Sequence, residues 1–160
     1  MEQANDGHEL SRADADHFAV ALAEWMKRTR DACSNAATWP ERVGAGLYAA
    51  IAFLVEEPQM ATSLLDFPTQ SRLGERYRRV VRESLELLEE AVPVPARAGP
   101  GGPSAAIAGI ALVAGDRLRA GQAHQLAALL PEMHLMVLLQ FLGFEEAKLH
   151  AEEFRSQAAS

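Results

Sequence analysis

The chain has few of the residues that would support covalent, metal-based or phosphate-binding chemistry. Cys33 is its single cysteine, so no disulfide can form within the chain and a cysteine-based zinc site is excluded. Lysine occurs only twice, as Lys27 and Lys148. The 15 basic residues stand against 22 acidic ones, which gives a formal net charge of −7. A nucleic-acid binder that depends on phosphate contacts needs a basic surface, so this balance argues against one.

The sequence also lacks the patterns of strands, membrane spans and targeting peptides. Alternation of apolar and polar residues never lasts, and β-branched residues are scarce, so no strand is predicted. The longest apolar run, residues 105–115, is too short to span a bilayer. Residues 1–11 are polar and acidic, unlike a secretory signal. We therefore expect a soluble, cytoplasmic protein that does not associate with membranes.

Helical spacing is present in nearly every segment. Thr38 and Glu41 have the spacing of a capping box at the start of one helix, and Pro58 interrupts that helix. Four prolines and three glycines in residues 92–103 indicate a loop. The sequence predicts an all-α fold, an antiparallel bundle of seven to eight helices. Residues 11–157 would form this single domain, and residues 1–10 a flexible tail.

The predicted helix over residues 131–142 is apolar on all sides. Such a helix must be covered on every face, and a small domain has room for few central helices. The small residues of the segment 105–115 would let a neighbouring helix approach closely. We therefore expect a homodimer built from two such helices of each subunit, with the segment 104–157 as the dimerisation half. The expected interface residues are Ala105, Gly109, Leu112, Met133, Val137, Leu138 and Phe141.

The order of these signals resembles the C-terminal regulatory domain of the TetR family of bacterial transcriptional repressors. The resemblance extends from about residue 16 to residue 154 and is carried by short motifs at helix boundaries. These are Thr38-Trp39-Pro40-Glu41-Arg42-Val43, Gly46-Leu47, Phe53-Leu54 before Glu57-Pro58, the segment 109–118, Leu129-Leu130-Pro131-Glu132 and Phe141-Leu142-Gly143-Phe144-Glu145-Glu146-Ala147. The resemblance implies that the first helices bind a small ligand and that the last long helices form a dimer. Residues 11–91 would then be the ligand-pocket half.

One departure from the family concerns DNA binding. Family members open with a three-helix segment that contains a helix-turn-helix. Nothing in residues 1–34 offers two short helices around a glycine turn with basic recognition residues. We therefore expect no nucleic-acid binding by this chain alone and interpret it as an effector domain without its own DNA-binding segment. A stand-alone dimerisation module that pairs with a full-length regulator is the first alternative.

Aromatic and methionine side chains in the first half supply the ligand-site candidates. Trp25, Tyr48, Met60 and Tyr77 are predicted to line a pocket for a small, largely apolar effector, with the two tyrosine hydroxyls available to orient it.

Catalytic and metal-binding signals are weak. Asp14 with His17 and Glu146 with His150 have helical ligand spacing, but a di-iron bundle needs two carboxylate-x-x-His pairs and two further glutamates. Cys33 lies on an apolar stripe, and no catalytic or dinucleotide motif is present. We expect neither an enzyme, a metal site nor a cofactor. A small helical metal protein or enzyme is the remaining alternative.

Overall fold

A computed structural model describes residues 3–65, 73–90, 92 and 102–158, and the side chains of residues 12–65, 75, 78–90, 92 and 102–156. Every regular element within these ranges is helical, which confirms the predicted all-α fold. In chain order the elements are α1 (Gln3–Ser34), α2 (Trp39–Glu56), α3 (Pro58–Leu65), α4 (Leu73–Glu89), α5 (Gly102–Arg119), the 3-10 helix η1 (Ala123–Leu129), α6 (Leu130–Leu142) and α7 (Phe144–Ala158).

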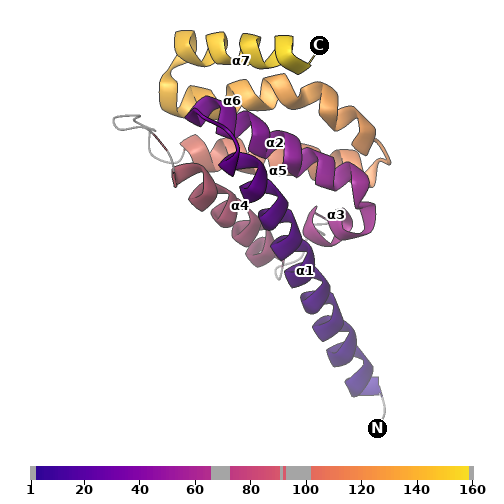
Figure 1. Ribbon diagram of the computed structural model, residues 1–160. Coiled ribbons are helices and arrows are strands. Elements are labelled where there is room, and N and C mark those ends of the chain that lie inside the picture. Colours follow the sequence, from indigo (N-terminus) through magenta and orange to yellow (C-terminus); the bar gives the residue numbers. More distant parts are fainter. Residues whose placement is uncertain (1–2, 66–72, 91, 93–101, 159–160) are drawn as a thin grey trace.

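The longest helix, α1, runs across the body and projects beyond it at the N-terminal end, whereas α6 and α7 lie at the opposite end (Figure 1). The predicted tail over residues 1–10 overlaps α1, which begins at Gln3. A helix that is already formed gains one backbone hydrogen bond for each residue added, so it can extend past its packed part. Most of the predicted loop, residues 93–101, lies outside the described residues.

The predicted capping box at the start of α2 is confirmed. The Glu41 backbone N–H donates to Thr38 Oγ1 at 3.4 Å, and the Thr38 backbone N–H donates to Glu41 Oε2 at 2.9 Å. Pro40 lies in the first turn, where a missing N–H costs no helical hydrogen bond. This start fixes the sharp connection between α1 and α2 and sets the two helices side by side.

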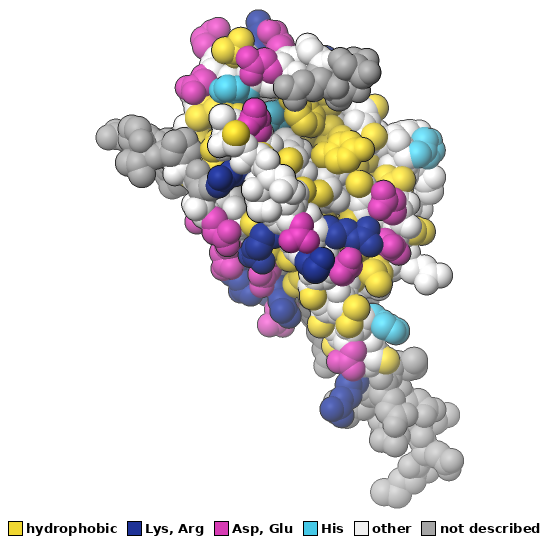
Figure 2. Space-filling view, viewed as in Figure 1, with side chains coloured by type: hydrophobic (Ala, Val, Ile, Leu, Met, Phe, Trp, Pro, Cys, Tyr) yellow, Lys and Arg dark blue, Asp and Glu magenta, His cyan; other side chains and the backbone are white. Residues whose placement is uncertain are grey.

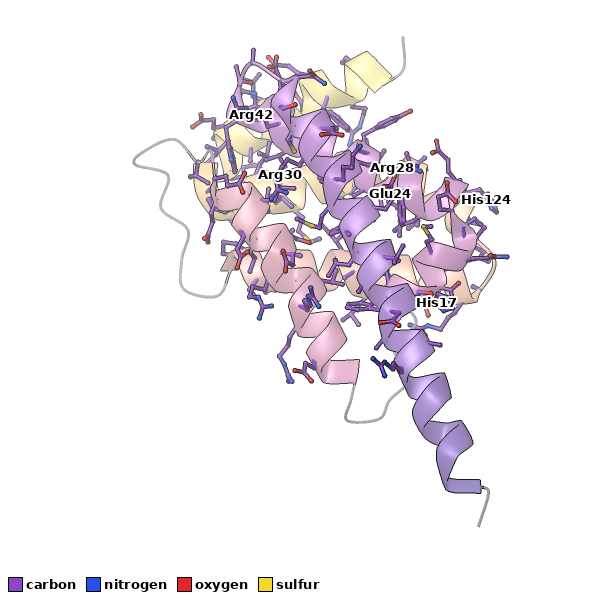
Figure 3. All side chains as sticks on the ribbon, turned by 60° about the horizontal axis from the view of Figure 1, so that its bottom comes forward. His17, Glu24, Arg28, Arg30, Arg42 and His124 are labelled. Atoms are coloured by element: carbon purple, nitrogen blue, oxygen red, sulfur yellow. The ribbon has the colours of Figure 1, made fainter. Side chains whose placement is uncertain are left out.

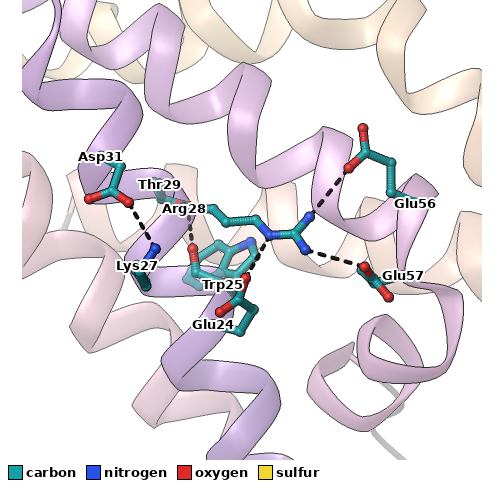
Figure 4. Close-up of polar contacts among 8 residues, drawn as sticks. All are labelled: Glu24, Trp25, Lys27, Arg28, Thr29, Asp31, Glu56 and Glu57. Atoms are coloured by element: carbon teal, nitrogen blue, oxygen red, sulfur yellow. Dashed lines mark hydrogen bonds and ion pairs between the residues drawn. The ribbon is translucent and has the colours of Figure 1, made fainter.

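Arg28, in the last third of α1, contacts Glu24 on the same helix and joins α1 to the C-terminal end of α2 through Glu56 and Glu57 (Figure 4). Its guanidinium donates to Glu24 at 2.8 Å, to Glu57 at 3.2 Å and to Glu56 at 3.3 Å. The same guanidinium carbon lies 5.2 Å from the centre of the Phe53 ring, within cation–π range. Charged side chains gather in a band over α1 and α2 (Figure 2). Arg28 is one-third exposed, and exposed ion pairs add little to the free energy of folding. We therefore infer that this network mainly fixes the orientation of α1 relative to α2.

The expectation that α6 needs a second chain to cover it is wrong for its inner face. Met133, Val137, Leu138 and Phe141 are buried within the single chain, with Val137 and Leu138 at 1% and 0% exposed. They pack in one core with α2, α5, η1 and α7, so they cannot form the predicted dimer interface. The spacing of residues within α6 does not predict this cover. The cover depends on how α7 folds back onto α6 after Gly143, whose φ is 79°.

The predicted interface residues on α5 have the opposite environment. Ala105 is exposed, Leu112 is 54% exposed, and a side chain added at Gly109 would meet nothing within 4 Å. The outward face of α5 is therefore apolar and uncovered within the described part of the chain.

His134 is the polar residue at the centre of the packing between α6, α2 and α7. Its Nε2 lies 2.9 Å from the Pro40 carbonyl oxygen, and its ring centre lies 4.6 Å from that of Phe154. Phe154 in turn packs on Gly44, where a Cβ atom would come within 2.8 Å of the ring. Nδ1 of His134 is buried without a hydrogen-bond partner among the described residues. This geometry suits a neutral imidazole that donates from Nε2.

We predict that His134 makes the fold sensitive to mild acid. Burial lowers its pKa below the ordinary value of 6.5, nearby His150 lowers it further, and the Pro40 carbonyl opposes both. Below pH 6.5 the unfolded chain therefore binds a proton that the folded chain does not. The contribution to stability is complete above pH 6.5 and is lost as pH falls toward the folded pKa, at no more than about 1.4 kcal/mol per pH unit.

Urea unfolding at several pH values between 5 and 7.5 measures this effect. As pH falls, the free energy of unfolding should decrease less steeply for His134→Gln than for the wild type. His124→Gln, a change at an exposed histidine, should keep the wild-type slope. Equal slopes for the wild type and His134→Gln would contradict the assignment.

Candidate ligand-binding cavity

A cavity of about 290 Å³ lies between α1, α2, α4 and α5, with further contributions from Leu64 and Leu65 on α3 and from Val137 on α6. Its volume is roughly twice the ~150 Å³ of apolar cavities that bind benzene. Aliphatic side chains make up most of the wall. They include Val43, Leu47, Ile51, Leu54, Leu64, Leu65, Val80, Leu87, Leu88, Ile107, Ile110 and Val137.

Small residues on two facing helices keep this space open. Gly46 and Ala50 on α2, and Ala111 and Ala114 on α5, all line the cavity. A leucine at any of the alanines would extend into the space that is now empty. Gly46 has a second role, because a Cβ atom there would lie 2.8 Å from Cys33 Sγ on α1. The glycine therefore sets how closely α1 and α2 approach.

One end of the cavity is polar and reaches the surface. Arg30, Ser34, Arg42 and Glu90 meet there, where α1 ends, α2 begins and α4 ends. Arg30 Nη2 lies 3.4 Å from Glu90 Oε1, and both side chains are more than half exposed. Figure 3 shows Arg30 and Arg42 on the side of α1 that faces α4, whereas Glu24 and Arg28 lie on its other side.

Cys33 also lines this end but is poorly suited to act as a nucleophile. It is half-buried, and its thiol lies 3.4 Å from the Arg42 carbonyl oxygen, to which it can donate. Burial raises the pKa of the thiol, Arg42 and Arg30 lower it, and Glu90 raises it further. The thiolate is the reactive form of cysteine, so a raised pKa keeps Cys33 in its inert form near neutral pH.

The cavity wall contains one buried donor without a partner. The indole Nε1 of Trp25 is buried and has no hydrogen-bond acceptor among the described residues. The other polar groups of the wall are satisfied locally. Thr29 Oγ1 donates to the Trp25 carbonyl at 2.8 Å, and Trp39 Nε1 donates to the Leu88 carbonyl at 3.2 Å. Trp25 therefore lines the cavity with other parts of its side chain, because its Nε1 atom is not accessible to a water molecule.

The structure brings only part of the predicted ligand site together. Trp25 lines the cavity as predicted. Tyr48 does not, because it is 62% exposed on the outward side of α2. Met60 is half-buried against the core, away from the cavity wall. The side chain of Tyr77 lies outside the described residues.

Sequence reasoning missed the contribution of α5. Ile107, Ile110, Ala111 and Ala114 all line the cavity, so the cavity is not confined to the predicted pocket half (residues 11–91) and extends into the predicted dimerisation half (residues 104–157). The alternation of alanine with isoleucine in this segment was the available signal. It indicates one small-residue face toward a neighbour, and the sequence does not say whether that neighbour is a helix or a ligand.

The described residues contain no group of three or more histidine, cysteine, aspartate or glutamate side chains that could hold a metal ion. Asp14 and His17 lie on the exposed part of α1, and Glu146 and His150 lie on α7. His150 Nδ1 is 3.3 Å from Glu153 Oε2, so its described partner is another surface carboxylate.

One helical stretch in the described part of the chain, Ala123–Leu142, is long and apolar enough to cross a membrane by length and composition alone. It consists of η1 and α6, and the inner face of α6 forms part of the core described above. About 39% of this stretch is buried inside the described structure.

Comparison with protein-family models, with curated proteins and with solved structures finds no match to this chain.

Proposed function

We propose that this chain is a regulatory domain of the TetR type that takes a small, largely apolar effector into its cavity and forms a homodimer. The observation that carries the proposal is the apolar cavity of about 290 Å³, which is close to the lower end of known ligand sites. Protein interiors are close-packed and contain few voids larger than a water molecule. A void of this size that reaches the surface at a polar end is typical of a binding site.

Two further observations support ligand binding. The small residues Gly46, Ala50, Ala111 and Ala114 line the cavity on α2 and α5, where larger side chains would occupy part of the space. The helix-boundary motifs that resemble TetR regulatory domains include Thr38-Trp39-Pro40-Glu41, which positions the start of α2 at the polar end. The proposal assigns no DNA contact to the described residues.

The proposed dimer surface is the outward face of α5 and α6. On α5 it holds Leu112 and Val113, which are 54% and 42% exposed. The two helices are neighbours joined by η1, and a side chain at Gly102 on α5 would contact Gln140 on α6. The surface consists of Ala105, Gly109, Leu112 and Val113 from α5 and of Met136 and Leu139 from α6. Two such helix pairs would form a four-helix bundle across a two-fold axis.

Ligand binding predicts a thermal shift that depends on the cavity. An apolar compound at 100 times its dissociation constant should stabilise the wild type by about 2.7 kcal/mol, or several degrees in melting temperature. Ala114→Leu, which places three more carbon atoms in the cavity, should lose most of this shift. Ala15→Leu, the same change at an exposed site on α1, should keep it.

A thermal-shift screen of small apolar compounds is the measurement. If no compound stabilises the wild type, or if Ala114→Leu responds as strongly as Ala15→Leu, the cavity is not the binding site.

The dimer predicts that a charge on the outward face separates the subunits without unfolding them. Leu112→Glu would bury an unpaired carboxylate in the dimer but leave it exposed in the monomer. Light scattering should give twice the 17.3 kDa chain mass for the wild type and the single-chain mass for Leu112→Glu. The helical circular dichroism signal of the variant should stay near that of the wild type.

Two variants complete this test. Leu138→Glu places the charge inside the core of one chain and should unfold the protein, because Leu138 is fully buried. Glu86→Lys, on the charged face of α4, should leave mass and stability within about 0.5 kcal/mol of the wild type. A wild-type protein that has the mass of one chain at micromolar concentration refutes the dimer.

A further inference from the structure

The cavity differs chemically between its two ends. Arg42 lies in the first turns of α2 at the polar end, and Leu54 lies in the last turn of the same helix at the other end. Twelve residues of α-helix span about 18 Å, so the lining follows α2 over this length, and we call the lined space the channel. Away from the polar end the lining is mostly aliphatic and includes Leu64 and Ile110. A molecule that matches the whole channel has one polar head and an apolar body.

The polar end carries an excess of positive charge. Among the charged residues that line the cavity, the two arginines Arg30 and Arg42 stand against one carboxylate, that of Glu90. The Arg30–Glu90 distance of 3.4 Å joins two exposed side chains, and such pairs are weak and easily exchanged. Arg42 uses its Nε to donate to the Ala36 carbonyl at 3.3 Å and forms no ion pair within the described part of the chain. Both guanidinium groups therefore have donors available for an incoming anion.

We infer that the effector is a small carboxylic acid with an apolar body, whose carboxylate binds Arg30 and Arg42 while the body fills the channel. This inference rests on the proposed function, because it names the chemical class for the same cavity. Guanidinium groups match the two oxygens of a carboxylate in geometry and charge. A cationic head group would be repelled by the two arginines, and a neutral head group would form no ion pair with them.

The volume of the cavity limits the size of the acid. At about 30 Å³ for each water-sized group, a cavity of about 290 Å³ holds roughly ten non-hydrogen atoms. Octanoate has this size and is the probe that we would use. Octanol and octylamine have the same chain with a neutral or a cationic head.

Calorimetric titration of the full chain with these three probes tests the head group. Octanoate should bind at least about threefold more tightly than octanol, and octylamine should bind most weakly. The preference for octanoate should decrease as salt is raised from about 0.02 to 0.5 M, because the arginines are partly exposed and salt screens them.

Variants of the polar end test the residues. Arg30→Gln and Arg42→Gln should each weaken octanoate binding about three- to tenfold and leave octanol binding unchanged. Glu90→Gln should strengthen octanoate binding, because it removes the competing carboxylate. Arg82→Gln removes an equal charge from α4 away from the cavity and should change neither affinity. Since Arg42 also supports the connection between α1 and α2, Arg42→Lys serves as its folded, charge-retaining counterpart, which should keep a preference for octanoate over octanol.

The outcomes separate the two proposals. If octanoate and octanol bind equally well and neither Arg30→Gln nor Arg42→Gln has an effect, the effector is not a carboxylic acid held by these arginines. The proposal that the cavity binds a ligand would then still stand. No binding of any of the three probes also overturns the acid, and the Ala114→Leu comparison in the broader screen then decides the proposed function by itself.

Discussion

The architecture depends on how closely α1 can approach α2. Gly46 faces Cys33 across this contact, and no other residue could do so without displacing the sulfur atom. The capping box at Thr38 and Glu41 fixes where α2 begins, and the contacts of Arg28 hold its far end to α1. With both ends set, the two helices form one continuous wall. The cavity is the space that remains between this wall and the small-residue face of α5.

In the second half of the chain, the strongly apolar helix α6 is buried within a small domain. The inner face of α6 is covered by α2, α5 and η1, and α7 folds back over it through the turn at Gly143. His134 is the polar exception in this region. Its buried ring anchors α6 to the first turn of α2 through the Pro40 carbonyl and to α7 through Phe154. The cavity and the outward face of α5 and α6 therefore lie on opposite sides of one shared core.

Local features of the fold follow from the sequence, and the site does so only in part. The start of α2 after Thr38 and the interruption at Pro58 depend on neighbouring residues alone, so their patterns predict them correctly. The cover of Leu138 and the exposure of Tyr48 depend on which helices pack together, and the spacing of residues does not contain that information. A cavity is harder still to predict, because it is defined by what Ala111 and Ala114 do not fill. The predicted site was based on aromatic and methionine side chains, yet of Trp25, Tyr48 and Met60 only Trp25 lines the cavity.

The empty volume between α2 and α5 has a consequence for the mechanical response of the fold. Water fills such voids when a chain unfolds, so the unfolded state occupies a smaller total volume than the folded one. High hydrostatic pressure therefore favours unfolding of this protein, starting from the helices around the cavity. A molecule lodged between Gly46 and Ala114 removes that volume difference, so the compressibility of the protein reports directly on whether the space is occupied.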